Sequence, residues 1–138
     1  MVSSEFLYYF GWVYLFSGLG VILTMLINHN FDQGSVRASA VSCLLVGLLF
    51  HFVPDLFQDY LQQMLPLAFC GATFIGMSRT QHFKSLSQML IAALIFTIVF
   101  TSSGVVFQGF GGKLGLIANI SVVATIGAFA VKRRIANT

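Results

Sequence analysis

Five apolar stretches, separated by short polar connections, account for most of this sequence. An α-helix rises ~1.5 Å per residue, so about 20 apolar residues cross the ~30 Å hydrocarbon core of a bilayer. We therefore predict an all-α, polytopic transmembrane helix bundle that forms a single domain over residues 1–138. The five predicted spans cover approximately residues 6–27, 36–54, 63–78, 87–103 and 114–131.

Charged side chains are too few to cover a water-soluble protein. They make up 8% of the chain and hydrophobic residues 57%, whereas soluble domains carry about 25% charged residues. A soluble protein of this size cannot bury nearly all of its side chains, because its surface is large relative to its volume. The net charge of +3 comes from cations at the flanks of apolar stretches rather than from a basic stripe. We expect contact with a lipid bilayer and no nucleic-acid partner.

The positions of the cationic residues predict the orientation. With five spans, the short loops that carry Arg37, Arg79 and Lys84 lie on the same side as the C-terminal cluster 132–134, and only Lys113 lies on the other side. Short loops rich in Lys and Arg face the cytoplasm. We predict an extracytoplasmic N-terminus and a cytoplasmic C-terminus in a bacterial inner membrane. The first 36 residues contain no Lys or Arg, which favours a retained first helix over a cleaved signal peptide.

The segment 104–115 contains five glycines among apolar residues. It is too apolar for an ordinary solvent loop and too rich in glycine for a regular helix. Non-helical backbone at membrane depth is tolerated where it is buried in protein or lines a water-filled cavity. We interpret this segment as re-entrant and as the neighbourhood of a transport path.

An offset of fifty residues relates two parts of the chain. Phe57 and Gln58 precede Phe107 and Gln108 by this offset, and Phe50 precedes Phe100. The pattern predicts a two-helix internal repeat, an arrangement that is common in transporters. Chance matching between two apolar segments is the alternative.

Small polar side chains inside the predicted spans are candidates for lining a path. Asn119 is the one amide well inside a span, and a buried amide needs a partner in protein or water. Hydrogen bonding between helices, without any path, is the alternative for the whole set. The candidates are Thr73, Thr101, Ser102, Ser103, Asn119, Ser121 and Thr125.

Small residues at helical spacing predict where helices pack closely, because they allow two backbones to approach. The candidate packing residues are Ala68, Ala72, Gly76, Gly111, Gly115 and Ala124. The two cysteines, Cys43 and Cys70, lie inside apolar stretches, so we expect buried residues of hydrophobic character rather than a disulfide framework.

Three titratable residues are candidates for sensing ions or protons. His51 and Asp55 are four apart, one helical turn, and form either a proton-responsive pair or an interfacial hydrogen bond. Lys113 follows two glycines and either attracts an anion among backbone N–H groups or is a solvated charge. The sequence carries no nucleophile–base pair and no metal or cofactor motif that we identify, so we expect no enzymatic activity, cofactor or metal.

These observations predict a small integral membrane transport subunit, a channel or a carrier, that acts as an oligomer. The path is expected near residues 104–115. The alternative is a non-catalytic structural or assembly subunit of a larger membrane protein complex, whose small-residue faces dock other subunits. We therefore expect either a homo-oligomer or a membrane-protein partner.

Overall fold

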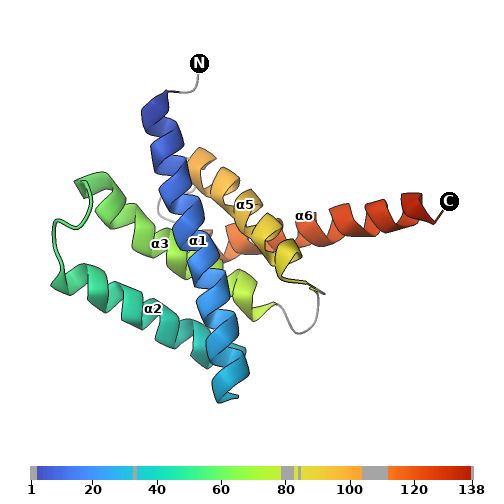
Figure 1. Ribbon diagram of the computed structural model, residues 1–138, viewed down its shortest axis with the longest axis horizontal. Coiled ribbons are helices and arrows are strands. Elements are labelled where there is room, and N and C mark those ends of the chain that lie inside the picture. Colours follow the sequence, from blue (N-terminus) through green and yellow to red (C-terminus); the bar gives the residue numbers. More distant parts are fainter. Residues whose placement is uncertain (1–2, 33, 79–82, 84, 104–111, 138) are drawn as a thin grey trace.

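The computed structural model describes residues 3–32, 34–78, 83, 85–103 and 112–137, and all regular secondary structure within these residues is α-helical. The predicted all-helical class is confirmed (Figure 1). The helices in this part of the chain are α1 (Ser4–Phe31), α2 (Ser35–Phe52), α3 (Asp59–Met77), α5 (Leu86–Ser102) and α6 (Lys113–Ala136).

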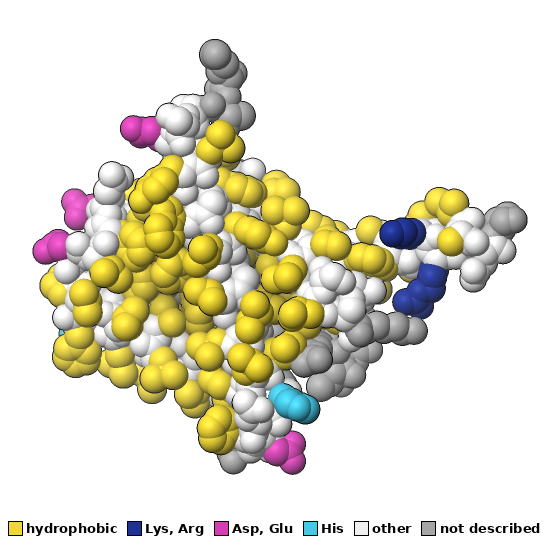
Figure 2. Space-filling model, viewed as in Figure 1, with side chains coloured by type: hydrophobic (Ala, Val, Ile, Leu, Met, Phe, Trp, Pro, Cys, Tyr) yellow, Lys and Arg dark blue, Asp and Glu magenta, His cyan; other side chains and the backbone are white. Residues whose placement is uncertain are grey.

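Three of the described helices, α1, α2 and α6, are long and apolar enough to cross a membrane. α5 is also apolar and has 17 residues. Many large apolar side chains lie on the outside of the bundle, as Figure 2 shows for one face. A water-soluble protein rarely exposes apolar surface on this scale, so the exposed surface supports a membrane protein.

Successive helices run in alternating directions. The starts of α1 and α3 meet the end of α5 around a pocket lined by Glu5, Tyr60 and Thr101. We call this the N-terminal end of the bundle. At the opposite end, the end of α1, the start of α2 and the end of α3 share a pocket lined by His29, Ser35 and Gly76. A neighbouring pocket is lined by Gln88 near the start of α5 and by Arg133 near the end of α6. Phe83 lines both pockets, so these parts of α5 and α6 also lie at the opposite end.

α3 is the central helix and contacts each of the other four. Nine of its residues are buried, more than in any other helix of the described chain. Its polar residues Gln62 and Gln63 lie near its start. One face of α3 remains exposed, with Gln63, Leu67 and Phe74 on it, while the other faces pack against its four neighbours.

The most extensive contact between helices joins α1 to α3. A Cβ atom placed on Gly20 would lie 2.7 Å from the carbonyl oxygen of Phe69, and one on Gly76 would lie 2.9 Å from the Val21 oxygen. The two helix backbones are therefore too close for any side chain at these positions. We call this contact the α1–α3 seam, defined by Gly20, Val21, Phe69 and Gly76.

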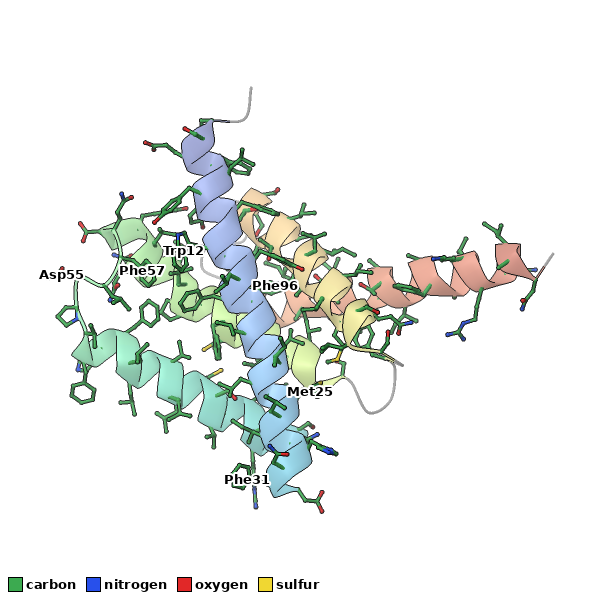
Figure 3. All side chains as sticks on the ribbon, viewed as in Figure 1. Trp12, Met25, Phe31, Asp55, Phe57 and Phe96 are labelled. Carbon is green, nitrogen blue, oxygen red and sulfur yellow. The ribbon has the colours of Figure 1, made fainter. Side chains whose placement is uncertain are left out.

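The connection between α2 and α3 is held by Gln62. Its side-chain amide donates to the carbonyl oxygens of Phe50 and Val53, and its Oε1 atom accepts a hydrogen bond from the backbone N–H of Phe57. The Phe57 ring then packs against Trp12 of α1, with ring centroids 4.9 Å apart (Figure 3). These contacts explain why α3 begins at Asp59, before the expected start near residue 63.

Lys113, the first residue of α6, holds the start of this helix against the end of α5. Its Nζ atom donates to the carbonyl oxygen of Ser103 over 3.3 Å and lies 5.9 Å from the centroid of the Phe100 ring. α6 then continues to Ala136, beyond the expected end near residue 131. Its C-terminal end projects away from the other helices (Figure 1).

Candidate functional site: unpaired hydroxyl groups between two pockets

The buried polar side chains of the described residues fall into two groups, according to whether their hydroxyl is hydrogen-bonded. Seven are bonded, and most donate to a backbone carbonyl one turn earlier on the same helix. An example is Thr97, whose Oγ1 atom lies 2.9 Å from the Ala93 oxygen. The bonded residues are Ser39, Ser42, Thr73, Thr97, Ser103, Ser121 and Thr125.

Ser17 and Thr24 form the second group. Both side chains are fully buried on α1, and neither hydroxyl oxygen has a hydrogen-bond partner. A buried polar group left unpaired costs about 1–3 kcal/mol. Since such groups are rare in native proteins, each calls for an explanation, such as a bound water or ion or a functional role. The two residues are seven apart, so they lie on one face of α1 about 10 Å from each other.

A pocket of about 800 Å³ lies at the N-terminal end of the bundle. It is open to the surface, and polar groups from three helices line it, including Glu5, Gln58 and Thr101. Thr101 lies half-buried on α5, and its hydroxyl donates to the Thr97 carbonyl oxygen. Aromatic and aliphatic side chains such as Phe6, Tyr8 and Leu61 also line it, so this pocket is mixed in character.

A second pocket, of about 630 Å³, lies at the opposite end of the bundle. Asn28 and His29 of α1 line this pocket. Asp32, the residue that follows α1, also lines it, together with Ser35 and Gly76. Thr24 is one helical turn from Asn28, and its Cβ atom would lie 2.9 Å from a Cβ atom on Gly76. Thr24 therefore lies close to the inner wall of this pocket.

The predicted path residues do not gather around one cavity. Thr101, Asn119 and Thr125 line three different pockets. Ser102 and Asn119 are exposed, whereas Ser103, Ser121 and Thr125 are buried and hydrogen-bond to backbone carbonyls of their own helices. Thr73 is buried on α3, and its hydroxyl lies 2.7 Å from the hydroxyl of Ser39 on α2.

The structure separates the titratable candidates from one another. His51 is exposed in the last turn of α2, and Asp55 follows the end of that helix with a positive φ of 69°. The continuous helix needed to place the two residues one turn apart is therefore absent between them. Lys113 is engaged with Ser103 and Phe100, as described above.

The predicted packing residues have different environments. Ala68, Ala72 and Gly76 are buried on α3, and a Cβ atom on Gly20 of α1 would lie 3.4 Å from that of Ala72. Gly115 is half-buried with no atom within 4 Å of an added Cβ, and Ala124 is exposed. The set also includes Gly111, which lies outside the described residues together with the rest of 104–111.

Sequence analysis missed Ser17 and Thr24. The available signal was their seven-residue spacing, with Gly18 and Gly20 between them, which places two hydroxyls on a face of small residues. Comparison with protein-family models, with curated proteins and with solved structures finds no match for this chain.

Proposed function

We propose that this chain is a small integral membrane transport subunit, a channel or a carrier, with its path along α1. The observation that carries the proposal is the pair of buried, unpaired hydroxyls of Ser17 and Thr24, located between the pockets at the two ends of the bundle. Hydroxyls that are not committed to the protein are available to a passing ion, water or polar solute. Thr101, which lines the N-terminal pocket, is three residues before the glycine-rich segment 104–115 in the sequence.

Five membrane crossings are part of this proposal. The alternation of helix directions supports them, because each connection then returns the chain to the opposite end. The distribution of charge supports an extracytoplasmic N-terminus. Glu5, Asp55 and Asp59 lie toward the N-terminal end and Asp32 lies at the opposite end, while the basic cluster Lys132, Arg133 and Arg134 lies on the projecting end of α6; Figure 2 shows acidic groups at both ends and basic groups on α6.

The α1–α3 seam closes the proposed path in this conformation. Gly20 lies between Ser17 and Thr24 on α1, and it is in direct contact with the backbone of Phe69. Transport then requires α1 and α3 to separate locally. Glycines at the seam suit this movement, since no interlocking side chain has to be withdrawn.

The two-helix repeat gains support from the positions of buried residues. At the fifty-residue offset, Ser42 corresponds to Ala92 and Phe50 to Phe100, and all four side chains are buried. The connections also correspond. Gln62 donates to the carbonyl oxygen of Val53, and Lys113 donates to the carbonyl oxygen of Ser103. The two acceptors, Val53 and Ser103, are fifty residues apart. Phe107 and Gln108 lie outside the described residues.

The alternative function, a structural subunit of a larger membrane complex, is favoured by one observation on α6. This helix exposes Asn119 beside large apolar residues such as Val123. An amide at membrane depth gains from a protein partner, either a second copy or another subunit. Purification in mild detergent separates the two functions, because recovery of a stable complex with other proteins favours the structural one.

Flux measurements in proteoliposomes test the transport proposal. The full chain should carry at least one member of a panel of monovalent ions and small polar solutes faster than empty liposomes. Ser17→Ala and Thr24→Val should lower that flux while leaving the fold as stable or more stable, by about 1 kcal/mol, because they remove unpaired hydroxyls. Thr97→Val is the matched control, since its hydroxyl is bonded within α5.

Two results would overturn the proposal. One is the absence of flux above empty liposomes over the whole panel. The other is equal flux in the wild type, Ser17→Ala and Thr24→Val proteins. The orientation is tested separately by a reporter fused after Thr138, which should be active only in the cytoplasm.

A further inference from the structure

The pocket at the N-terminal end of the bundle brings aromatic rings and a carboxylate together. Its volume of about 800 Å³ falls within the ~300–1,000 Å³ typical of sites for small organic ligands. Glu5, Tyr8 and Tyr9 line it and are spaced by three and four residues, so they lie on one face of the first turns of α1. Tyr60 lines it from α3, and its ring centroid lies 5.2 Å from that of Tyr9. Two helices therefore contribute tyrosine rings to the same pocket.

The rings that line this pocket are only partly covered by protein. Tyr60 is 60% exposed, Tyr8 56% and Phe6 46%, whereas a ring that serves packing alone, such as Phe96 on α5, is fully buried. The face of an aromatic ring carries partial negative charge, so it attracts a cation placed within ~6 Å of its centroid. Exposed tyrosines also occur at membrane interfaces in general, and the carboxylate among them is what distinguishes this pocket.

The charges at this end of the bundle favour a cationic ligand. Glu5 is the one charged side chain among the described residues that line the pocket, and Asp55 and Asp59 lie at the same end. In the part of the chain that the structure describes, Lys113 is the one Lys or Arg at this end. It does not line the pocket, and its Nζ atom donates to the Ser103 carbonyl oxygen.

The helix dipoles at the pocket do not reverse this preference. The starts of α1 and α3 carry partial positive charge, and Glu5 and Asp59 in their first turns offset it. The end of α5, where Thr101 lines the pocket, carries partial negative charge. A cation in the pocket is therefore favoured by a helix end as well as by the carboxylates.

We propose that this pocket binds an organic monocation through an alkylammonium group, which is held among Tyr8, Tyr60 and Glu5. Proteins recognise quaternary ammonium groups with aromatic rings in this way. Phe6 and Leu61 supply apolar surface for the rest of the ligand. A metal ion such as Ca²⁺ fits this pocket poorly, because it needs about six or more oxygen ligands.

Binding at this pocket is independent of the proposed transport path. It is measured on the purified chain without a flux assay. Failure to bind the cation would leave the Ser17–Thr24 path untouched, and absence of flux would leave this site untouched.

The test is a titration of the full chain in dodecyl maltoside with benzyltrimethylammonium, followed by the fluorescence of Trp12. This residue is the single tryptophan, and its ring centroid lies 6.1 Å from that of Tyr8, close enough to report on the pocket. We expect saturable binding at one site per chain. Choline should compete for the site, and the uncharged analogue of choline with carbon in place of the ammonium nitrogen should not.

Substitutions in the pocket separate the contributions of rings and charge. Tyr8→Ala and Tyr60→Ala should each weaken binding by about two- to fivefold, while Tyr8→Phe and Tyr60→Phe keep the ring and should bind as the wild type does. Glu5→Gln should weaken binding by about two- to fivefold at low ionic strength and by less at high salt, because Glu5 is exposed and its charge is screened.

Two matched controls lie at the same end of the bundle but outside the pocket. Phe52→Ala removes an exposed ring, and Asp55→Asn removes an exposed carboxylate. Both variants should bind benzyltrimethylammonium within about twofold of the wild type, since neither side chain reaches the ligand. Circular dichroism establishes that each variant is folded, and Tyr8→Leu or Tyr60→Leu replaces an alanine variant that is not.

An alkylammonium group is available from a free organic cation or from the headgroup of a zwitterionic phospholipid. Nanodiscs separate these sources. If the occupant is a headgroup, phosphatidylcholine nanodiscs should block the probe and phosphatidylglycerol nanodiscs should admit it, both measured against empty nanodiscs. If the occupant is a free cation, both should admit it. Each of these results supports the ammonium site.

Three results would overturn the proposal. The first is the absence of saturable binding both in dodecyl maltoside and in phosphatidylglycerol nanodiscs. The second is undiminished binding in the Tyr8→Ala/Tyr60→Ala double variant. The third is an equal loss of affinity in Glu5→Gln and Asp55→Asn, which would assign the binding to the general negative charge of this end rather than to the pocket.

Discussion

Among the described glycines, Gly20 is the one at which an added Cβ atom would lie nearest to the backbone of another helix, so its substitution by alanine probes that contact. The added Cβ atom would lie 2.7 Å from the Phe69 carbonyl oxygen and 3.4 Å from the Ala72 Cβ atom. Ordinary contacts begin at 3.4 Å, so the distance to the oxygen has to lengthen by about 0.7 Å. Because the obstacle is backbone, no side-chain rotation relieves it and α1 must move away from α3.

The expected magnitude follows from two opposing effects. Forcing an extra methyl group into a packed interior costs about 1–3 kcal/mol. Replacing a helical glycine by alanine returns up to about 1 kcal/mol through helix propensity. Gly11→Ala on the same helix isolates the second effect, because nothing lies within 4 Å of an added Cβ there. Gly20→Ala should therefore be less stable than Gly11→Ala by about 1–3 kcal/mol.

The assay is equilibrium unfolding in mixed micelles with increasing sodium dodecyl sulfate, followed by far-ultraviolet circular dichroism. The free energies of unfolding of the wild type and both variants are compared at one detergent ratio. If the two variants agreed within about 0.5 kcal/mol, the range seen for substitutions without special contacts, α1 and α3 would not meet at Gly20.

Three further substitutions test the connections between helices. Gln62→Leu leaves the Phe57 N–H and the Phe50 and Val53 carbonyls without this partner, so it should lower the free energy of unfolding by about 1–3 kcal/mol. Gln63→Leu, at an exposed position, should have little effect in the same assay. Lys113→Met removes the hydrogen bond to Ser103 and should lower the free energy of unfolding by about 1 kcal/mol. Lys113→Arg keeps a cationic donor at this position, so equal stability of the two variants would argue against this contact. Phe57→Ala should shift the emission of Trp12, the single tryptophan, to longer wavelength, because the indole loses its edge-to-face partner, and Phe52→Ala, on an exposed ring, should leave the spectrum unchanged.

The helices themselves were predictable, because long apolar stretches bounded by polar residues carry that information locally. Their ends were less so. The start of α3 depends on Gln62 reaching back to Phe50 and Val53, and α3 includes Pro66 within the helix. These contacts form only when the end of α2 has been placed next to the start of α3.

The candidate site was harder to predict than the fold. Helices that are apolar on nearly every side have no marked polar face, so periodicity does not reveal which side of α1 or α6 is buried. Hydroxyl groups look alike in the sequence. Thr97 bonds to its own helix, Thr73 bonds to Ser39 on another helix, and Thr24 remains unpaired. Only the packed arrangement distinguishes these three states.

The central position of α3 has a consequence for how the protein is made. A helix with two glutamines and a proline in its first half partitions poorly into lipid by itself. α1 is synthesised first and presents Gly20 and Val21 against the residues of α3 that need cover. Under the five crossings proposed above, stable integration of α3 depends on a helix that is already in the bilayer. A weakened partner would then be detected during biogenesis, as chains removed by quality control, before any defect in the finished protein is measured.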